Sequence, residues 1–140
     1  MSDMVAKQSV SQLARWWLPI FGLFVIHNLE EILGDMPAWG REHLDFLSQT
    51  FVSPMALTAI IIVLSAVLFT IAYHYRQNAR MTRRLLLLFL VIMIGVFIWH
   101  ITISLVTQSI QPGVLTAGVF LPIYGFMLFH IYRTKQTLYP

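Results

Sequence analysis

Three ionisable side chains, His27, Glu30 and Glu31, lie within five residues of one another in a long apolar stretch. On an α-helix, residues three and four positions apart share a face, so the imidazole and both carboxylates would point to the same side. Imidazole nitrogens and carboxylate oxygens together suit zinc, iron or manganese. This cluster therefore indicates a metal site or an acid–base site on the first helix.

Placing this cluster in a membrane costs free energy. The apolar run 18–26 and the residues that follow it are predicted to form the first membrane span, and the cluster lies within that span. On insertion scales, an acidic residue at the centre of a membrane span costs roughly 3 kcal/mol of insertion free energy. Each Leu, Ile, Phe or Val contributes only about 0.5 kcal/mol in favour of insertion. Such groups persist in lipid when something inside the protein pairs with them. We therefore expect a metal ion, a cationic or protonated side chain, or a water-filled cavity beside the cluster.

A second histidine is predicted at the same depth on another helix. His27 lies seven residues before Gly34, and His100 lies eight residues before Gln108. At 1.5 Å per residue both would stand about 10 to 12 Å below the outer boundary of the membrane. His43, in the outer loop, could fold onto the cluster, but a solvated loop histidine is the simpler interpretation.

Two metal arrangements fit this spacing. In zinc proteases with an H-x-x-E-H motif, the first and last residues bind the metal and the glutamate is the general base. By analogy, His27, Glu31 and His100 would form a His₂Glu zinc site, and Glu30 would be the catalytic base that activates water. Alternatively, Glu30 joins Glu31 as a ligand and the two carboxylates bridge two metals, which would need further carboxylates from a second copy of the chain. Zinc is favoured, with iron or manganese as alternatives.

A structural interpretation competes with these. A histidine and a glutamate one turn apart can hydrogen-bond each other and do no more than fix helix packing. One such residue would be ordinary in this role. Three on one helix, with a fourth at equal depth on another, favour a functional site.

Composition places the cluster in a membrane protein. Of 140 residues, 58% are hydrophobic and only 11% are charged, against about a quarter charged in average chains. The absence of cysteine excludes thiolate ligands and disulfides. We predict an all-α fold, a single transmembrane domain over 1–140 built as a four-helix bundle, with helices at about 12–33, 55–75, 85–108 and 114–133.

The distribution of basic residues predicts the topology. Of the nine lysines and arginines, only Arg41 lies in the loop between the first two predicted helices. The other eight lie on the opposite side of the membrane. The positive-inside rule then places both chain termini in the cytoplasm. This distribution also explains the net charge of +3 without nucleic acid as a partner.

In the outer loop, Leu44, Leu47 and Phe51 recur at helical spacing, which fits a short amphipathic segment as well as a plain linker.

His27-x-x-Glu30-Glu31, the later His100 and the pair Pro112-Gly113 occur in a definite order. In these residues the chain resembles the HXXEE family of small bacterial integral membrane proteins. The family has tyrosine where this chain has Ile110, so no phenol from that position can hydrogen-bond at the site. The resemblance implies a multi-pass protein of the bacterial inner (cytoplasmic) membrane and implies no particular reaction. From the residues alone, Pro112-Gly113 predicts a tight turn between the last two helices.

These observations favour a metal-dependent membrane enzyme that hydrolyses or otherwise transforms a lipid or another hydrophobic small molecule. One alternative is a proton-coupled exporter of cationic drugs that uses Glu30 or Glu31. Another is a metal-free isomerase in which His27 and a glutamate act as acid and base. Haem ligation by His27 and His100 is disfavoured by the adjacent carboxylates. The expected partners are the lipid bilayer, the hydrophobic substrate and, for a shared site, a second copy of the chain.

Overall fold

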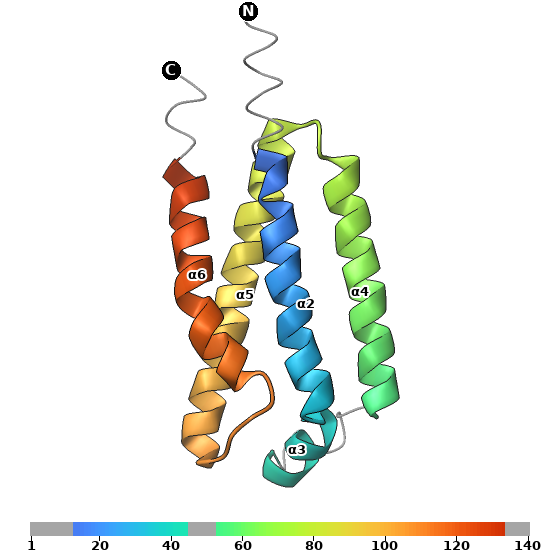
Figure 1. Ribbon diagram of the computed structural model, residues 1–140, viewed down its shortest axis with the longest axis vertical. Helices are drawn as coiled ribbons and strands as arrows, with labels where there is room; N and C mark the ends of the chain where they lie inside the picture. The colour runs from blue at the N-terminus through green and yellow to red at the C-terminus, as the bar shows by residue number, and fades with distance from the viewer. Residues whose placement is uncertain (1–12, 45–52, 134–140) are drawn as a thin grey trace, which may run out of the picture.

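The computed structural model of the chain describes residues 13–44 and 53–133. All regular structure in these residues is helical, which confirms the all-α class: α2 (Trp17–Leu33), α3 (Met36–His43), α4 (Pro54–His74), α5 (Ala79–Thr107) and α6 (Val114–Arg133). The long helices α2, α4, α5 and α6 run side by side in Figure 1, and the short α3 lies at one end of them. The first turn of α2 and the last turn of α6 lie together at the other end (Figure 1).

Three of the described helices are long and apolar enough to cross a membrane. They are 55–74 within α4, α5 and α6, with mean hydropathies of 2.6, 2.7 and 1.8. Helix α2 has 17 residues and carries the His/Glu cluster, and it spans about 25 Å at 1.5 Å per residue. By length and composition the chain is therefore a membrane protein.

The first predicted helix, at about 12–33, is interrupted by a turn near its start, and residue 12 lies outside the described residues. Residues 13–15 are helical, Trp16 is a turn, and α2 starts at Trp17. Pro19 supplies the physical reason, because it has no N–H to donate to the carbonyl of residue 15 and its ring would clash there. A continuous helix through this point is therefore disfavoured, and proline is accommodated in the first turn of a new one.

Helix α5 begins at Ala79, six residues before the predicted start at 85. Its cap is Asn78, whose side-chain oxygen accepts a hydrogen bond from the Met81 amide at 3.0 Å. Arg83, which lies between the predicted helices 55–75 and 85–108, is therefore helical. Its guanidinium donates to the carbonyls of Ile131 and Tyr132 at 3.3 and 3.0 Å. This contact ties the start of α5 to the end of α6.

The core holds α2, α5 and α6 in register. Phe97 of α5 and Tyr124 of α6 are fully buried, with ring centroids 5.0 Å apart in an edge-to-face arrangement. The Tyr124 hydroxyl donates to the carbonyl of Ile20 on α2 at 2.8 Å. Helix α4 packs beside α2, away from α6 (Figure 1). The three helices that supply the site are therefore fixed to one another below it.

A short helix does occupy the loop after α2, but it lies earlier than the predicted amphipathic segment. That prediction falls on Leu44, Leu47 and Phe51, and residues 45–52 are outside the described part of the chain. Helix α3 instead covers Met36–His43, and its Trp39 donates from Nε1 to the Ser109 hydroxyl at 3.1 Å. Helix α3 thus packs against the loop that joins α5 to α6.

Candidate metal centre

Two histidines and one glutamate meet near the ends of α2 and α5. The Nε2 of His100 lies 3.0 Å from Oε1 of Glu31, and the Nε2 of His27 lies 3.8 Å from the same oxygen. The imidazole centroids are 4.9 Å apart and the ring planes are nearly perpendicular at 88°. Both histidines are 2% exposed. One donor atom from each of the three residues lies within 4.8 Å of the others.

The predicted equality of depth is what brings the histidines together. His27 stands six residues before the end of α2, and His100 stands seven residues before the end of α5. These two helices run in the same direction in Figure 1, so similar rises put both rings at one level. Phe97, one turn before His100, packs edge-on against His27 with centroids 5.0 Å apart. Glu31 follows His27 by one turn and shares its face.

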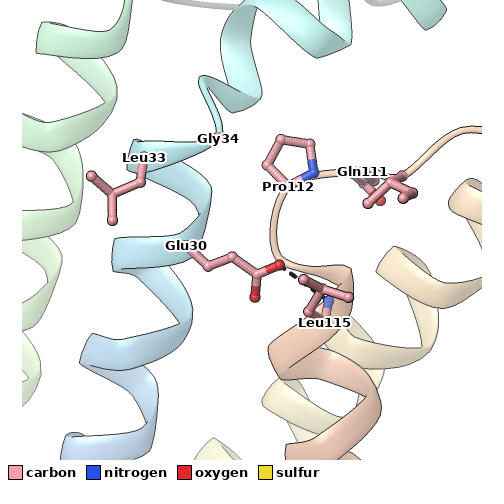
Figure 2. Close-up of a pocket in the computed structure, with 7 residues that line it drawn as sticks. Glu30, Leu33, Gly34, Gln111, Pro112 and Leu115 are labelled. Carbon is pink, nitrogen blue, oxygen red and sulfur yellow. Dashed lines mark hydrogen bonds between the residues drawn. The ribbon is translucent and has the colours of Figure 1, made fainter.

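Glu30 lies apart from this group. Its two carboxylate oxygens accept hydrogen bonds from the backbone amides of Leu115 and Thr116, at 3.1 and 2.8 Å. Figure 2 shows the carboxylate pointing from α2 toward the first turn of α6. The first amides of a helix have no partner within the helix and attract anions. Glu30 is therefore not among the three residues whose donor atoms converge, and its roles as metal ligand and catalytic base stay predictions.

Thr116 belongs to the site and was missed by the sequence analysis. Its Oγ1 lies 2.8 Å from Nδ1 of His27, and its hydroxyl donates to the Gly113 carbonyl at 3.2 Å. The sequence offers one signal for it, because Thr116 is the first side chain capable of hydrogen bonding after the Pro112-Gly113 turn. The sequence does not show that Thr116 faces α2, because this depends on how α6 packs against α2.

Gly113 is required by the site for two reasons. Its φ of +95° is a backbone conformation that residues with a Cβ rarely adopt. A Cβ here would also lie 2.8 Å from Cε1 of His100 and 3.0 Å from Cε1 of His27. The predicted tight turn is therefore present, and its backbone packs directly against both imidazoles. Next to it, Pro112 packs so closely on Gly34 that a Cβ at Gly34 would lie 2.7 Å from the proline Cβ.

The remaining histidines do not join the group. His43 stacks on Trp39 with centroids 4.8 Å apart, and its Nδ1 lies 3.0 Å from the Trp39 carbonyl oxygen. His74 ends α4 and packs against Tyr75, while His130 lies against Trp16. Both belong to the last turns of α4 and α6, which lie at the opposite end of the bundle (Figure 1).

The donor set fits a metal ion. Two imidazoles and one carboxylate are the protein ligands of catalytic His₂Glu zinc sites. Donors bound tetrahedrally at 2.0–2.1 Å stand about 3.3 Å apart, and the distances of 3.0 and 3.8 Å bracket this value. The Nε2 of His27 is buried and has no hydrogen-bond partner among the described residues. An unpaired buried nitrogen of this kind needs an explanation, and a bound cation supplies one.

A cavity of about 560 Å³ lies between the end of α2 and the loop before α6, on the side of Glu30, and none of His27, Glu31 and His100 lines it. The residues that line it, all but Ile110 labelled in Figure 2, are Glu30, Leu33, Gly34, Ile110, Gln111, Pro112 and Leu115. Its walls are mostly aliphatic, and the side chains of Leu33, Ile110 and Leu115 are largely exposed. Gln111 is fully buried, and its amide oxygen has no partner in the described part of the chain. The cavity therefore offers apolar surface with a few polar groups.

Fold and site together define a small α-helical membrane protein with a His/Glu/His group near one end of its helices. Residues 16–127 match the family described as "Protein of unknown function with HXXEE motif", and the chain belongs to this HXXEE family. The matched region contains every residue of the site, including Gly113 and Thr116. No curated protein and no solved structure is detectably similar to the chain.

Proposed function

We propose that this protein is a metal-dependent enzyme of the bacterial inner membrane, with a site in the outer half of the bilayer. In this proposal α2 is a fourth membrane span, both termini are cytoplasmic, and α3 lies at the outer surface. Helix α2 lies alongside the three apolar helices, in the same direction as α5 and opposite to α4 and α6, and this supports the topology (Figure 1). The arginines at the start of α5 and the end of α6 support the same orientation.

The observation that carries the proposal is the convergence of His27, Glu31 and His100. Their donor atoms lie within 4.8 Å of one another, although they come from two helices far apart in sequence. Both histidines are buried, and the Nε2 of His27 has no hydrogen-bond partner among the described residues, which is unfavourable away from water. A divalent ion would satisfy all three residues. The His₂Glu set favours zinc, with iron or manganese as alternatives.

The reaction we favour is hydrolysis, or a related transformation, of a lipid or another hydrophobic molecule. A bound metal would supply Lewis-acid activation of a carbonyl or phosphoryl oxygen and a nucleophile at neutral pH. The chain itself contributes the three ligands and the neighbouring cavity. Aliphatic walls at Leu33, Ile110 and Leu115 suit a substrate that arrives from the bilayer. Because Glu30 is bound to backbone amides, we assign no general base to that position.

One further function has a specific observation in its favour. His100 and Glu31 are 3.0 Å apart, which is a hydrogen-bonding distance without any metal. Such a pair could transfer protons in an isomerase for a membrane-dissolved substrate. The exporter hypothesis has less support, because the Glu30 carboxylate already accepts two backbone hydrogen bonds.

Elemental analysis of the detergent-purified chain tests the metal proposal. We expect about one metal ion per chain, lost in His27→Ala and His100→Ala. His43→Ala is the matched control, because His43 lies at the same end of the bundle outside the group. Helical circular dichroism of each variant distinguishes loss of metal from loss of fold. A folded wild-type chain that takes up no zinc, iron or manganese refutes the metal site and leaves the acid–base alternative.

A further inference from the structure

We propose that Glu30 and Thr116 are positioning residues that select the tautomer of His27. Glu30 holds the first turn of α6 against α2, and Thr116 then accepts the Nδ1 proton of His27. The Nε2 lone pair of His27 is thereby directed at the space shared with Glu31 and His100. This inference rests on the proposed metal site, because it assigns the residues that prepare one of its ligands.

The first step is the attachment of α6 to α2. Glu30 accepts from two consecutive amides, Leu115 at 3.1 Å and Thr116 at 2.8 Å. Both amides belong to the first turn of α6, where the helix leaves them unpaired. The contact is visible in Figure 2 as the bond from Glu30 to Leu115. Since one of the two amides is that of Thr116, the carboxylate fixes the backbone of the residue that touches His27.

The second step is the direction of the hydrogen bond between Thr116 and His27. A threonine hydroxyl has one proton, and Thr116 donates it to the Gly113 carbonyl at 3.2 Å. With its proton directed to that carbonyl, the Thr116 oxygen is free to accept from Nδ1 of His27, 2.8 Å away, and this is the direction that we infer. A neutral imidazole carries one N–H, so a proton on Nδ1 leaves Nε2 as an acceptor. Hydrogen bonds of this kind to the outer nitrogen fix the tautomer of metal-binding histidines.

The third step concerns what Nε2 faces. It lies 3.8 Å from Oε1 of Glu31 and has no hydrogen-bond partner in the described residues. A lone pair on Nε2 and a carboxylate oxygen are both acceptors, so they do not attract each other directly. A cation between them satisfies both. The tautomer set by Thr116 therefore prepares His27 as a metal ligand, and the contact of Gly113 with both rings keeps the geometry compact.

The test compares Thr116→Val, Thr116→Ser and the wild-type full chain in detergent. Zinc affinity is measured by competition with a chromophoric chelator. Loss of an outer hydrogen bond to a ligand typically weakens metal binding by about 10- to 100-fold. We expect a loss of this size in Thr116→Val and recovery to within about threefold of wild type in Thr116→Ser. Thr102→Val is the matched control, because Thr102 is exposed on α5 and outside the group, and we expect it to leave affinity unchanged.

A spectroscopic measurement separates positioning from general destabilisation. Long-range ¹H–¹⁵N correlation spectra of histidine-labelled, metal-free chain report which ring nitrogen carries the proton. We expect the Nδ1–H tautomer of His27 in the wild type and in Thr116→Ser, and a mixture in Thr116→Val and Glu30→Ala. An Nε2–H tautomer in the wild type overturns the inference, as does wild-type zinc affinity in a folded Thr116→Val chain. If the wild type binds no metal, the proposed function fails while the tautomer spectrum still decides this inference.

Discussion

Glu30 and Glu31 are adjacent on α2, yet their carboxylates contact different helices. Glu31 reaches His100 of α5 at 3.0 Å, and Glu30 reaches the backbone of Leu115 and Thr116 on α6. Consecutive residues on a helix are rotated by about 100°, which is enough to direct one toward each neighbour. The two acidic residues of the motif therefore connect the same helix to two different partners.

The two glutamates should respond differently to loss of charge. Glu31→Gln replaces a carboxylate ligand by an amide, so we expect loss of stoichiometric zinc with little change in helical content. Glu30→Gln keeps the ligand set but removes an anion from the first turn of α6, at a cost of about 1 kcal/mol in stability. Metal analysis and thermal unfolding in detergent measure the two effects. Equal zinc loss in both variants without any change in stability would contradict this division of roles.

Gly113→Ala should damage both the fold and the metal site. The left-handed backbone costs a residue with a Cβ about 1 to 2 kcal/mol, and the new Cβ would collide with the imidazoles of His27 and His100. We expect a lower unfolding temperature and weaker zinc binding. Gly118→Ala is the control on α6, because its added Cβ meets nothing within 4 Å. In a helix interior that change should be neutral or stabilising by up to about 1 kcal/mol.

Zinc should stabilise the folded chain if it binds at the proposed centre. A ligand at 100 times its dissociation constant adds about 2.7 kcal/mol to the free energy of unfolding. We expect a rise in unfolding temperature with added zinc for the wild type and His43→Ala. His27→Ala and His100→Ala should show no such rise. A shift that persists in both of these variants would locate the zinc elsewhere.

Tyr124→Phe should weaken the connection between α6 and α2. The variant removes the hydroxyl that donates to the Ile20 carbonyl at 2.8 Å while keeping the buried ring. We expect a loss of about 1 kcal/mol in the free energy of unfolding. Tyr73→Phe is the control, because that side chain is 58% exposed. Chemical unfolding monitored by circular dichroism distinguishes them, and equal stabilities would argue against a role for the Tyr124 hydroxyl.

Sequence patterns predicted much of this arrangement. The apolar composition predicted membrane-spanning helices, and the count of residues from each helix end predicted that His27 and His100 lie at one level. The i, i+4 relation predicted that Glu31 joins His27. Each of these depends on distances along one helix, which the α-helical repeat determines.

The parts that escaped prediction depend on how neighbouring helices are packed. Helical spacing placed Glu30 on the same face of α2 as His27. It could not show that the N-terminus of α6 packs against Glu30. Thr116 escaped notice for the same reason. The turn at Trp16 is different, since Pro19 is visible in the sequence and its effect on the carbonyl of residue 15 follows from its missing N–H.

The turn before α6 also closes one side of the site. Its Gly113 backbone lies against both imidazoles, and Pro112 packs on the end of α2 at Gly34. Because the rings are only 4.9 Å apart, a main chain without a Cβ fits beside them where a side chain would not. This boundary of the site is therefore made of backbone, and substitution of the surrounding side chains leaves it in place.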